Sequence, residues 1–435
     1  MNPRAVFGIC AMLLFTAALS FSLRTGASGA IKEALFDPID PARSGEMIAT
    51  ALGNSFLGFA IALLIIAPLL DVFGAKRMIL LASICYIVGP LLIVLSPKAG
   101  GALAVYHTLM AGMVISGIAW GASEATINPL VAALYPNDKT QRLNALHAWW
   151  PAGIVLGGLT SILAFKQLHL GWEAAILPIC PAGAILGLWA LGQRFPPTES
   201  IALGVPFREV LAEPFKRPTF WIFPAVMFLT ASTELAPGSW VDIALSKTVG
   251  MPGILVLVYV SAVMFVMRHF AGVLGRRFSD MGLLWLTTAP AALGLYLLSV
   301  ASSPPAALGA ATLWAVGVSF MWPTMLAATS RRYRDGGPWT IGIVAFAGAM
   351  ATYFVLPQLG KVYDRAKLEA AGGEAAFAHL SPDKLGRVLA YAAEKSFQTV
   401  AIIPVVLFFI FAVVWLIERR RPLGDKDAVG VPRGL

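Results

Sequence analysis

Four ionisable side chains lie well inside long apolar stretches of the chain: Arg24, Glu124, Glu234 and Arg268. A charged group at the centre of a bilayer costs at least about 2.5–3.5 kcal/mol, so it persists where it is paired or lies in a water-filled cavity. Each half of the chain holds one of the acids and one of the arginines. We expect Glu124 and Glu234 to carry protons across a membrane. The alternative is two structural ion pairs, Arg24 with Glu124 and Glu234 with Arg268.

Other polar and aromatic side chains occur at similar depth. Hydrogen-bonding groups can hold the edge of a sugar, and aromatic rings can cover its C–H face. The arginines could instead clamp the carboxylate of an acidic solute, and the tryptophans could serve only in packing or at the lipid interface. The candidates for solute binding are Arg24, Asn128, His147, Trp150, Trp240, Arg268, Trp314 and Trp322.

The composition indicates the elements that position these groups. Of 435 residues, 58% are hydrophobic and only 13% are charged, whereas soluble domains have roughly 45–50% and about 25%. A membrane-spanning helix needs about 20 apolar residues, and the chain has twelve such segments. We therefore predict an all-α polytopic membrane protein of twelve transmembrane helices, near residues 6–29, 47–70, 78–95, 103–134, 146–165, 173–193, 219–244, 252–275, 282–300, 306–329, 339–360 and 397–417.

Basic residues are enriched in alternate connections, which predicts a multi-pass protein of the cytoplasmic (inner) membrane with both termini cytoplasmic. The polar segment 194–218 is expected to be a cytoplasmic linker between two six-helix bundles, residues 1–193 and 219–417. This layout is typical of transporters built from parallel repeats. Within the second bundle, the external segment 361–396 is expected to form a short amphipathic helix on the outer face. Residues 418–435 would be a cytoplasmic tail.

The turn between the second and third spans carries Asp71, Gly74, Lys76 and Arg77. Glycine permits a tight turn, and basic residues anchor a cytoplasmic face. This motif resembles the loop signature of the major facilitator superfamily, in which an Asp is followed by Gly and a basic pair. The resemblance implies that these four residues act in gating between conformations.

A second resemblance is narrower. Glu124 precedes Asn128-Pro129, and after a short polar loop the chain continues with His147-Ala148-Trp149-Trp150. This region is similar to helices 4 and 5 of the fucose permease-like sugar–proton symporters, as is the segment Thr233–Trp240 of the seventh span. The resemblance implies that Glu124 takes part in proton-coupled sugar transport. The Asn-Asp pair usual in the first span of that branch is replaced here by Phe21–Gly26. Near Glu234, Pro237-Gly238 is expected to interrupt the seventh helix.

These features predict a transporter that moves a sugar or similar small polar solute by alternating access, together with a proton. An organic-anion or sugar-acid carrier, or an exporter of the same fold, is the alternative. An enzyme or sensor is not expected, because the sequence lacks the common hydrolase, phosphate-binding and metal-ligating motifs. We expect no cofactor, no metal, and no nucleic-acid partner despite the net charge of +9, because the basic residues are dispersed between apolar segments. We also expect a monomer in the lipid bilayer.

Overall fold

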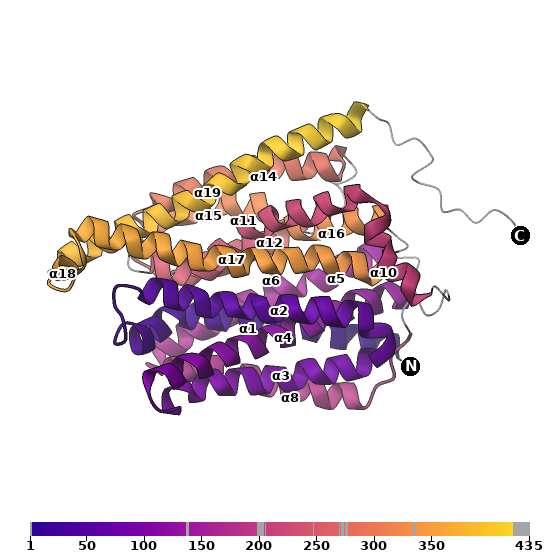
Figure 1. Cartoon of the computed structure of the whole chain (residues 1–435), viewed down its shortest axis with the longest axis horizontal. Coiled ribbons are helices and arrows are strands. Elements are labelled where there is room, and N and C mark those ends of the chain that lie inside the picture. Colours follow the sequence, from indigo (N-terminus) through magenta and orange to yellow (C-terminus); the bar gives the residue numbers. More distant parts are fainter. Residues whose placement is uncertain are drawn as a thin grey trace, which may run out of the picture.

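The computed structural model describes residues 2–135, 139–197, 204, 206–246, 248–268, 270, 274, 277–333 and 336–420. All regular elements in these ranges are helices, and most run along the longest axis of the molecule (Figure 1). The first half contains α1 Pro3–Ile31, α2 Ser44–Phe73, α3 Ala75–Leu95, α4 Ala102–Leu134, α5 Lys139–His147, α6 Trp149–Ile162, α7 Trp172–Ile176 and α8 Ile179–Leu191. The second contains α11 Ile222–Leu245, α12 Ile254–Arg268, α14 Asp280–Ser299, α15 Pro304–Val318, α16 Met321–Arg332, α17 Gly337–Ala371, α18 Glu374–Phe377 and α19 Pro382–Arg420.

Short elements connect the main helices. Helix α10, Phe207–Lys216, lies between the two halves of the sequence. Single turns of π-helix follow α1 and α6, at Lys32–Phe36 and Leu163–Gln167. Two 3-10 turns occur at Ser96–Lys98 and Pro218–Trp221. Helices α10 and α18 mark opposite ends of the molecule, and the N-terminus lies at the α10 end (Figure 1).

The predicted membrane spans are present in the described part of the chain. Eleven segments are long and apolar enough to cross a membrane, and α12 is a shorter apolar helix. The end of the predicted span 252–275 lies partly outside the described residues. The fifth span is divided into α5 and α6, and the tenth into α15 and α16. In contrast, α11 continues through Pro237-Gly238, so the predicted interruption of the seventh span is wrong.

The most extensive contacts between the two halves are those of α2 with α17, α6 with α12, and α1 with α11. Within the first half, α2 and α4 pack closely because glycines face main-chain atoms across the contact. A Cβ atom added to Gly58 would collide with the carbonyl group of Val114, and one added to Gly117 would collide with that of Ser55. Small residues commonly allow such close approach of membrane helices. The tight crossing fixes the position of α4, which carries Glu124.

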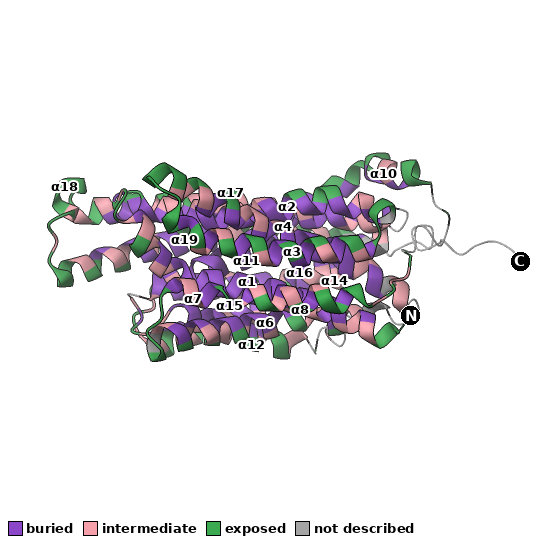
Figure 2. Ribbon diagram, turned by 90° about the horizontal axis from the view of Figure 1, so that it is seen from below, coloured by how far each residue is buried: buried purple, intermediate pink, exposed green. Residues whose placement is uncertain are grey.

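Buried residues fill the space between the helices, whereas exposed residues occur on the outer faces and at the two ends (Figure 2). Many outward-facing side chains at mid-length are large and apolar. On α19 these include Ile402, Phe409, Val413 and Ile417, each more than half exposed. An apolar surface of this extent would be a liability in water but is required in lipid, which offers no hydrogen bonds.

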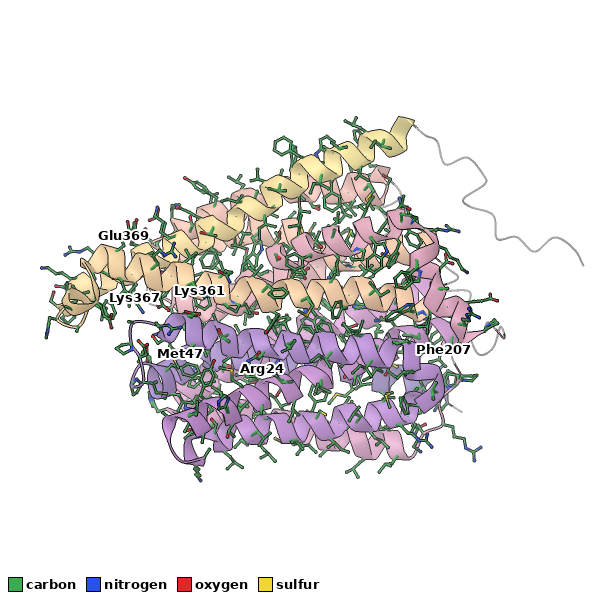
Figure 3. All side chains as sticks on the ribbon, viewed as in Figure 1. Arg24, Met47, Phe207, Lys361, Lys367 and Glu369 are labelled. Atoms are coloured by element: carbon green, nitrogen blue, oxygen red, sulfur yellow. The ribbon has the colours of Figure 1, made fainter. Side chains whose placement is uncertain are left out.

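The segment 361–396 differs from its expected form. Instead of a separate amphipathic helix on the outer face, it continues α17 to Ala371 and begins α19 at Pro382, with α18 between them. The result is a helical hairpin that projects beyond the other helices at the α18 end (Figure 1). Lys361 and Lys367 on α17 lie near Met47 of α2, close to the base of this hairpin (Figure 3). The hairpin therefore extends α17, the helix that packs against α2 of the first half.

Candidate functional site

A pocket of about 320 Å³ lies between the two halves, midway along the molecule. Six of the side chains that line it were predicted to bind protons or solute. The complete lining consists of Trp120, Glu124, His147, Trp150, Glu234, Leu235, Arg268 and Trp322.

On one side of the pocket, Glu124 begins a chain of hydrogen bonds. Asn128 Nδ2 donates to Glu124 Oε2 at 3.0 Å, and Asn128 Oδ1 lies 3.0 Å from His147 Nε2. An amide oxygen only accepts hydrogen bonds, so His147 Nε2 carries the proton in this arrangement. Asn128 and Glu124 are one turn apart on α4, which places them on the same helix face. The amide therefore orients the carboxyl group toward the pocket.

Proline residues explain the breaks in the fifth and tenth spans. Pro151 follows His147 by four positions, and Pro323 follows Ser319 by four. Proline has no N–H to donate, and its ring clashes with the carbonyl group four residues earlier. The carbonyl oxygens of His147 and Ser319 thus lose their helical donors at the ends of α5 and α15. Both oxygens point to one side chain, Arg268.

Arg268 connects the two breaks. Its Nη1 donates to His147 O at 3.3 Å, and its Nε donates to Ser319 O at 3.2 Å. A cation at the carboxyl end of a helix is favourable because the carbonyl dipoles point toward it. His147 belongs to the first half of the protein and Ser319 to the second. One guanidinium therefore links the halves beside the pocket.

The Arg268 guanidinium also forms an ion pair with Glu234. Arg268 Nη2 lies 3.6 Å from Glu234 Oε1, and the two side chains are 8% and 7% exposed. The second oxygen, Glu234 Oε2, is buried and has no hydrogen-bond partner. Because an unsatisfied buried acceptor costs about 1–3 kcal/mol, Oε2 is positioned to accept a hydrogen bond from a ligand.

Four aromatic rings form a column along the pocket. Trp120 stacks on Phe59, with ring centroids 4.1 Å apart and planes 3° apart, and on Trp150 at 4.8 Å and 25°. Trp322 of the second half follows, 6.3 Å from Phe59. The sequence predicts Trp150 and Trp322, but not Trp120, as binding residues. Its spacing of four residues from Glu124 on one helix is a signal that could have identified it.

A second cavity, of about 360 Å³, lies between α2 and α4 of the first half and α16 and α17 of the second. Ala67, Pro129 and Pro338 line it near the helix ends that face α10. Glu124 is the one residue that lines both cavities among those described. Asn128 also lines the second cavity. The Glu124 carboxyl group thus separates the central pocket from a cavity nearer the α10 end.

Three residues that were predicted to bind solute, Arg24, Trp240 and Trp314, lie outside the central pocket. Arg24 is 2% exposed, and its Nη1 donates to Ser20 Oγ at 2.8 Å. Arg24 and Glu124 are both described, and no ion pair joins them. Trp240 donates to Ser396 Oγ at 3.2 Å. None of the three lines the central pocket.

Trp314, the third of these residues, has a structural partner near Glu234. Its Nε1 donates to Thr233 O at 3.1 Å. Thr233 precedes Pro237 by four positions, so this carbonyl group is another that proline deprives of its helical donor. The indole supplies the missing hydrogen bond. This contact explains how α11 continues through Pro237.

The predicted gating residues lie at the α10 end. Asp71 is in the last turn of α2, and Gly74 joins α2 to α3 with a φ of +76°, which favours glycine. Lys76 Nζ donates to Leu191 O at 2.6 Å, at the carboxyl end of α8. Arg77 is exposed. The turn therefore links α2, α3 and α8.

Two helical bundles around a buried polar pocket define a polytopic membrane protein of the transporter class. A family model of the Major Facilitator Superfamily matches residues 5–357, which is most of the chain. The chain therefore belongs to this superfamily of membrane transporters.

Known relatives and structures agree with this assignment. A stretch of 132 residues is 31% identical to a D-xylose transporter of Levilactobacillus brevis and covers 30% of this chain and 26% of that relative. The chain thus matches about a quarter of that relative's length. The inward-open xylose transporter XylE from E. coli has a TM-score of 0.71 and 12% identity, covering 94% of this chain and 96% of its own. The E. coli fucose–proton symporter FucP has a TM-score of 0.61 and 19% identity, covering 95% and 99%. At these identities the structural likeness concerns the fold.

Proposed function

We propose that this transporter moves a neutral sugar, or a similar small polyhydroxylated solute, in symport with a proton. The observation that carries the proposal is the central pocket, where groups from both halves meet. It contains two carboxyl groups, one guanidinium group already bonded to protein, and a column of aromatic rings. A sugar offers hydroxyl groups, which both donate and accept hydrogen bonds, and C–H faces that pack on aromatic rings. The relatives named for xylose and fucose transport support this solute class.

The charges in the pocket favour a neutral solute over an acidic one. The Arg268 guanidinium is engaged by two carbonyl groups and by Glu234. An anionic solute would have to displace these partners and approach Glu124 and Glu234, and like charges brought together repel. A hydroxyl group can instead donate to the free Glu234 Oε2. The organic-anion carrier remains the second candidate, with Arg268 as its clamp.

Glu124 is the better placed of the two acids to couple transport to protons. It lines the central pocket and also the cavity toward the α10 end, whereas Glu234 faces the pocket and is held by Arg268. A carboxyl group that faces two compartments in turn can take up a proton on one side and release it on the other. We assign Glu124 as the proton-coupling residue, with Glu234 as a partner of Arg268 and of the solute. His147, Asn128, Trp150 and Trp322 complete the binding site.

The orientation follows from the basic residues at the α10 end. The termini, α10 and the turn with Lys76 and Arg77 would be cytoplasmic, in the inner membrane of a cell. The α18 end would then face outward. Movement of the bundles about the central site would involve the turn of Asp71 and Gly74 as a gate. We propose the protein acts as a monomer, because each chain contains both bundles and a complete site.

Uptake by cells that lack competing carriers tests the solute class and the coupling. We expect radiolabelled neutral pentoses or hexoses to accumulate, and a protonophore to abolish their accumulation because it removes the proton gradient. Unlabelled neutral sugars should compete, and the corresponding sugar acids should not. Stronger competition by the acids would favour the anion carrier instead. Accumulation that persists with the protonophore would rule out proton coupling.

A further inference from the structure

Within the proposed function, the structure points to one residue that selects the solute. We propose that the Trp120 indole N–H donates a hydrogen bond to an oxygen of the bound sugar, and that this bond determines which sugars are transported. The inference rests on the sugar-transport proposal and adds a specific contact to it.

The Trp120 indole has an N–H group that is available to a solute. The side chain is 3% exposed, and its buried Nε1 makes no hydrogen bond of good geometry, although it interacts with the nearby Glu124 carboxyl group. Buried tryptophan N–H groups usually find a partner, and leaving one unpaired is costly. Because Trp120 lines the central pocket, a bound solute can supply the missing acceptor.

The Trp120 ring is also held in place before any solute binds. It stacks on two other rings: its centroid lies 4.1 Å from that of Phe59 and 4.8 Å from that of Trp150. A donor fixed in position loses little entropy on binding and discriminates strongly by geometry. Glu234 Oε2 provides the complementary free acceptor in the same pocket. One donor and one acceptor without partners together match the hydroxyl groups of a sugar.

A series of deoxy sugars tests this contact. For the wild-type transporter, one deoxy analogue should show a KM about tenfold or more above that of the parent sugar, since a site built to bond a hydroxyl group rejects the analogue that lacks it. Trp120→Phe keeps the stacked ring but removes the N–H. This variant should raise the KM of the parent sugar by a similar factor. It should leave the KM of the deoxy analogue unchanged, because that analogue does not make the bond in the wild type either.

The chain offers a matched control. Trp285 on α14 also has a buried Nε1 without a partner and also stacks on another ring, Trp415, at 5.0 Å and 26°, but it does not line the pocket. Trp285→Phe should therefore preserve the wild-type pattern of KM values. Trp120→His keeps a ring N–H. Compared with Trp120→Phe, it should therefore restore part of the difference in KM between the parent sugar and the deoxy analogue. All rates are normalised to the transporter present in the membrane.

The outcomes separate this inference from the proposed function. If Trp120→Phe retains the wild-type KM and the same analogue pattern while the wild type accumulates sugar, the role of Trp120 is refuted and sugar transport stands. The same conclusion follows if Trp285→Phe changes the pattern as much as Trp120→Phe. If the wild type transports no sugar, the proposed function itself fails.

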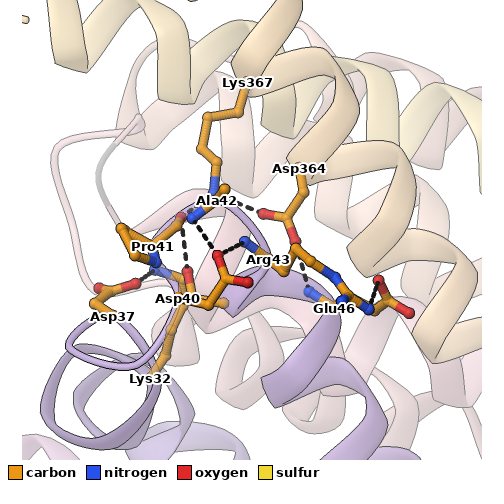
Figure 4. Close-up of polar contacts among 10 residues, drawn as sticks. Lys32, Asp37, Asp40, Pro41, Ala42, Arg43, Glu46, Asp364 and Lys367 are labelled. Atoms are coloured by element: carbon orange, nitrogen blue, oxygen red, sulfur yellow. Dashed lines mark hydrogen bonds and ion pairs between the residues drawn. The ribbon is translucent and has the colours of Figure 1, made fainter. Parts of the chain in front are cut away.

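Independent contacts at the α18 end carry a second inference. There, Asp364 of α17 reaches across to the first half, where its Oδ2 accepts a hydrogen bond from Glu46 N at 2.7 Å (Figure 4). Glu46 lies in the first turn of α2, whose N–H groups have no helical acceptor. A carboxylate there also interacts favourably with the helix dipole. Asp364 thus caps a helix of the opposite half.

Lys367 completes this contact. Its Nζ lies 2.7 Å from Asp364 Oδ1 and donates to Pro41 O, in the connection before α2, at 2.9 Å (Figure 4). Both charged side chains are nearly buried, at 2% exposed for Lys367 and 8% for Asp364. The main chains also meet, because a Cβ atom on Gly360 would lie 2.6 Å from Gly45 O. We call Pro41, Glu46, Asp364 and Lys367 the clasp.

We infer that the clasp holds the α18 end of the solute path closed and must open for solute to enter from that side. Asp242 of α11 adds a similar contact, because its Oδ2 accepts from Gly29 N of α1 at 3.3 Å. Both carboxylates belong to the second half and both amides to the first. Separation of the halves at this end breaks the bonds that Asp364, Lys367 and Asp242 make to the first half.

Labelling of a cysteine in the pocket tests the clasp. In a background with Cys10, Cys85 and Cys180 replaced by alanine, Leu235→Cys reports access to the central pocket. An impermeant maleimide is applied separately from each side of the membrane. Asp364→Asn leaves Lys367 without its counter-charge, and we expect labelling from the α18 side to accelerate about tenfold or more. Arg365→Gln, an exposed change on the same helix, is the control.

Lys367→Gln provides an independent second variant and should have the same effect. Unchanged labelling from the α18 side in both clasp variants would refute the gate. Equal acceleration by Arg365→Gln would also refute it, because the effect would not be specific to the clasp.

Discussion

Glu124→Gln is expected to abolish accumulation of sugar against a gradient while leaving sugar exchange across the membrane intact. Glutamine keeps the size of the side chain and can still accept a hydrogen bond from Asn128, but it cannot carry a proton. Uphill uptake driven by protons therefore loses its coupling, whereas binding and movement of the bundles continue. The measurement compares the ratio of internal to external sugar at steady state with the rate of exchange in preloaded vesicles.

Glu369→Gln is the matched control, because Glu369 is exposed near the α18 end (Figure 3) and lines neither cavity. It should accumulate sugar to the wild-type ratio. Full accumulation by Glu124→Gln would remove Glu124 from the mechanism. Loss of exchange as well as accumulation would show that Glu124 is needed for binding or movement and not only for coupling.

Arg268→Met is expected to lower the stability of the folded protein strongly. The substitution leaves Glu234 buried without its cation, and removing one partner of a buried pair typically costs about 3–5 kcal/mol. It also leaves the carbonyl groups of His147 and Ser319 without donors at the two proline breaks. We expect the purified variant to unfold at a markedly lower temperature and to lose transport.

The double variant Arg268→Met with Glu234→Gln separates these two causes. It removes the uncompensated charge, so part of the stability should return. The two carbonyl groups remain unsatisfied, so stability should stay below that of the wild type. Arg365→Met, which alters an exposed arginine, is the control for loss of a positive charge. A double variant no more stable than Arg268→Met would show that the Glu234 charge does not depend on Arg268.

Much of the fold could be predicted because it follows from composition and from the cost of charge in lipid. The spans and their division into two bundles reflect long apolar segments separated by basic connections. The same cost indicates which residues face the interior, and Glu124, Glu234 and Arg268 do meet in one pocket. Which binding residues act on a solute stays a prediction.

The pairing of these groups was harder to predict. Depth in the membrane does not specify direction around a helix, so the sequence does not distinguish Trp240 and Trp314 from Trp150 and Trp322. Their N–H groups instead bond Ser396 and Thr233 outside the pocket. The proline effects also depend on context. Pro151 and Pro323 accompany helix breaks, whereas α11 continues through Pro237 with the help of Trp314 from a distant part of the chain.

The segment 361–396 shows a further limit of sequence patterns. Its charged residues indicate exposure to water, which is compatible with a helix on the surface or with helices that continue beyond the membrane. The choice depends on tertiary contacts. The Asp364–Lys367 pair docks α17 against the start of α2, and this contact supports the continuation of α17 to Ala371.

Proton movement on addition of sugar tests the central claim most directly. Vesicles of known orientation containing the wild-type transporter are suspended, without an imposed gradient, in a lightly buffered medium with a pH electrode. A neutral sugar that enters with a proton should make the external medium more alkaline, and Glu124→Gln should eliminate that change while sugar still equilibrates. Sugar entry through the wild type with no change in external pH would contradict the account.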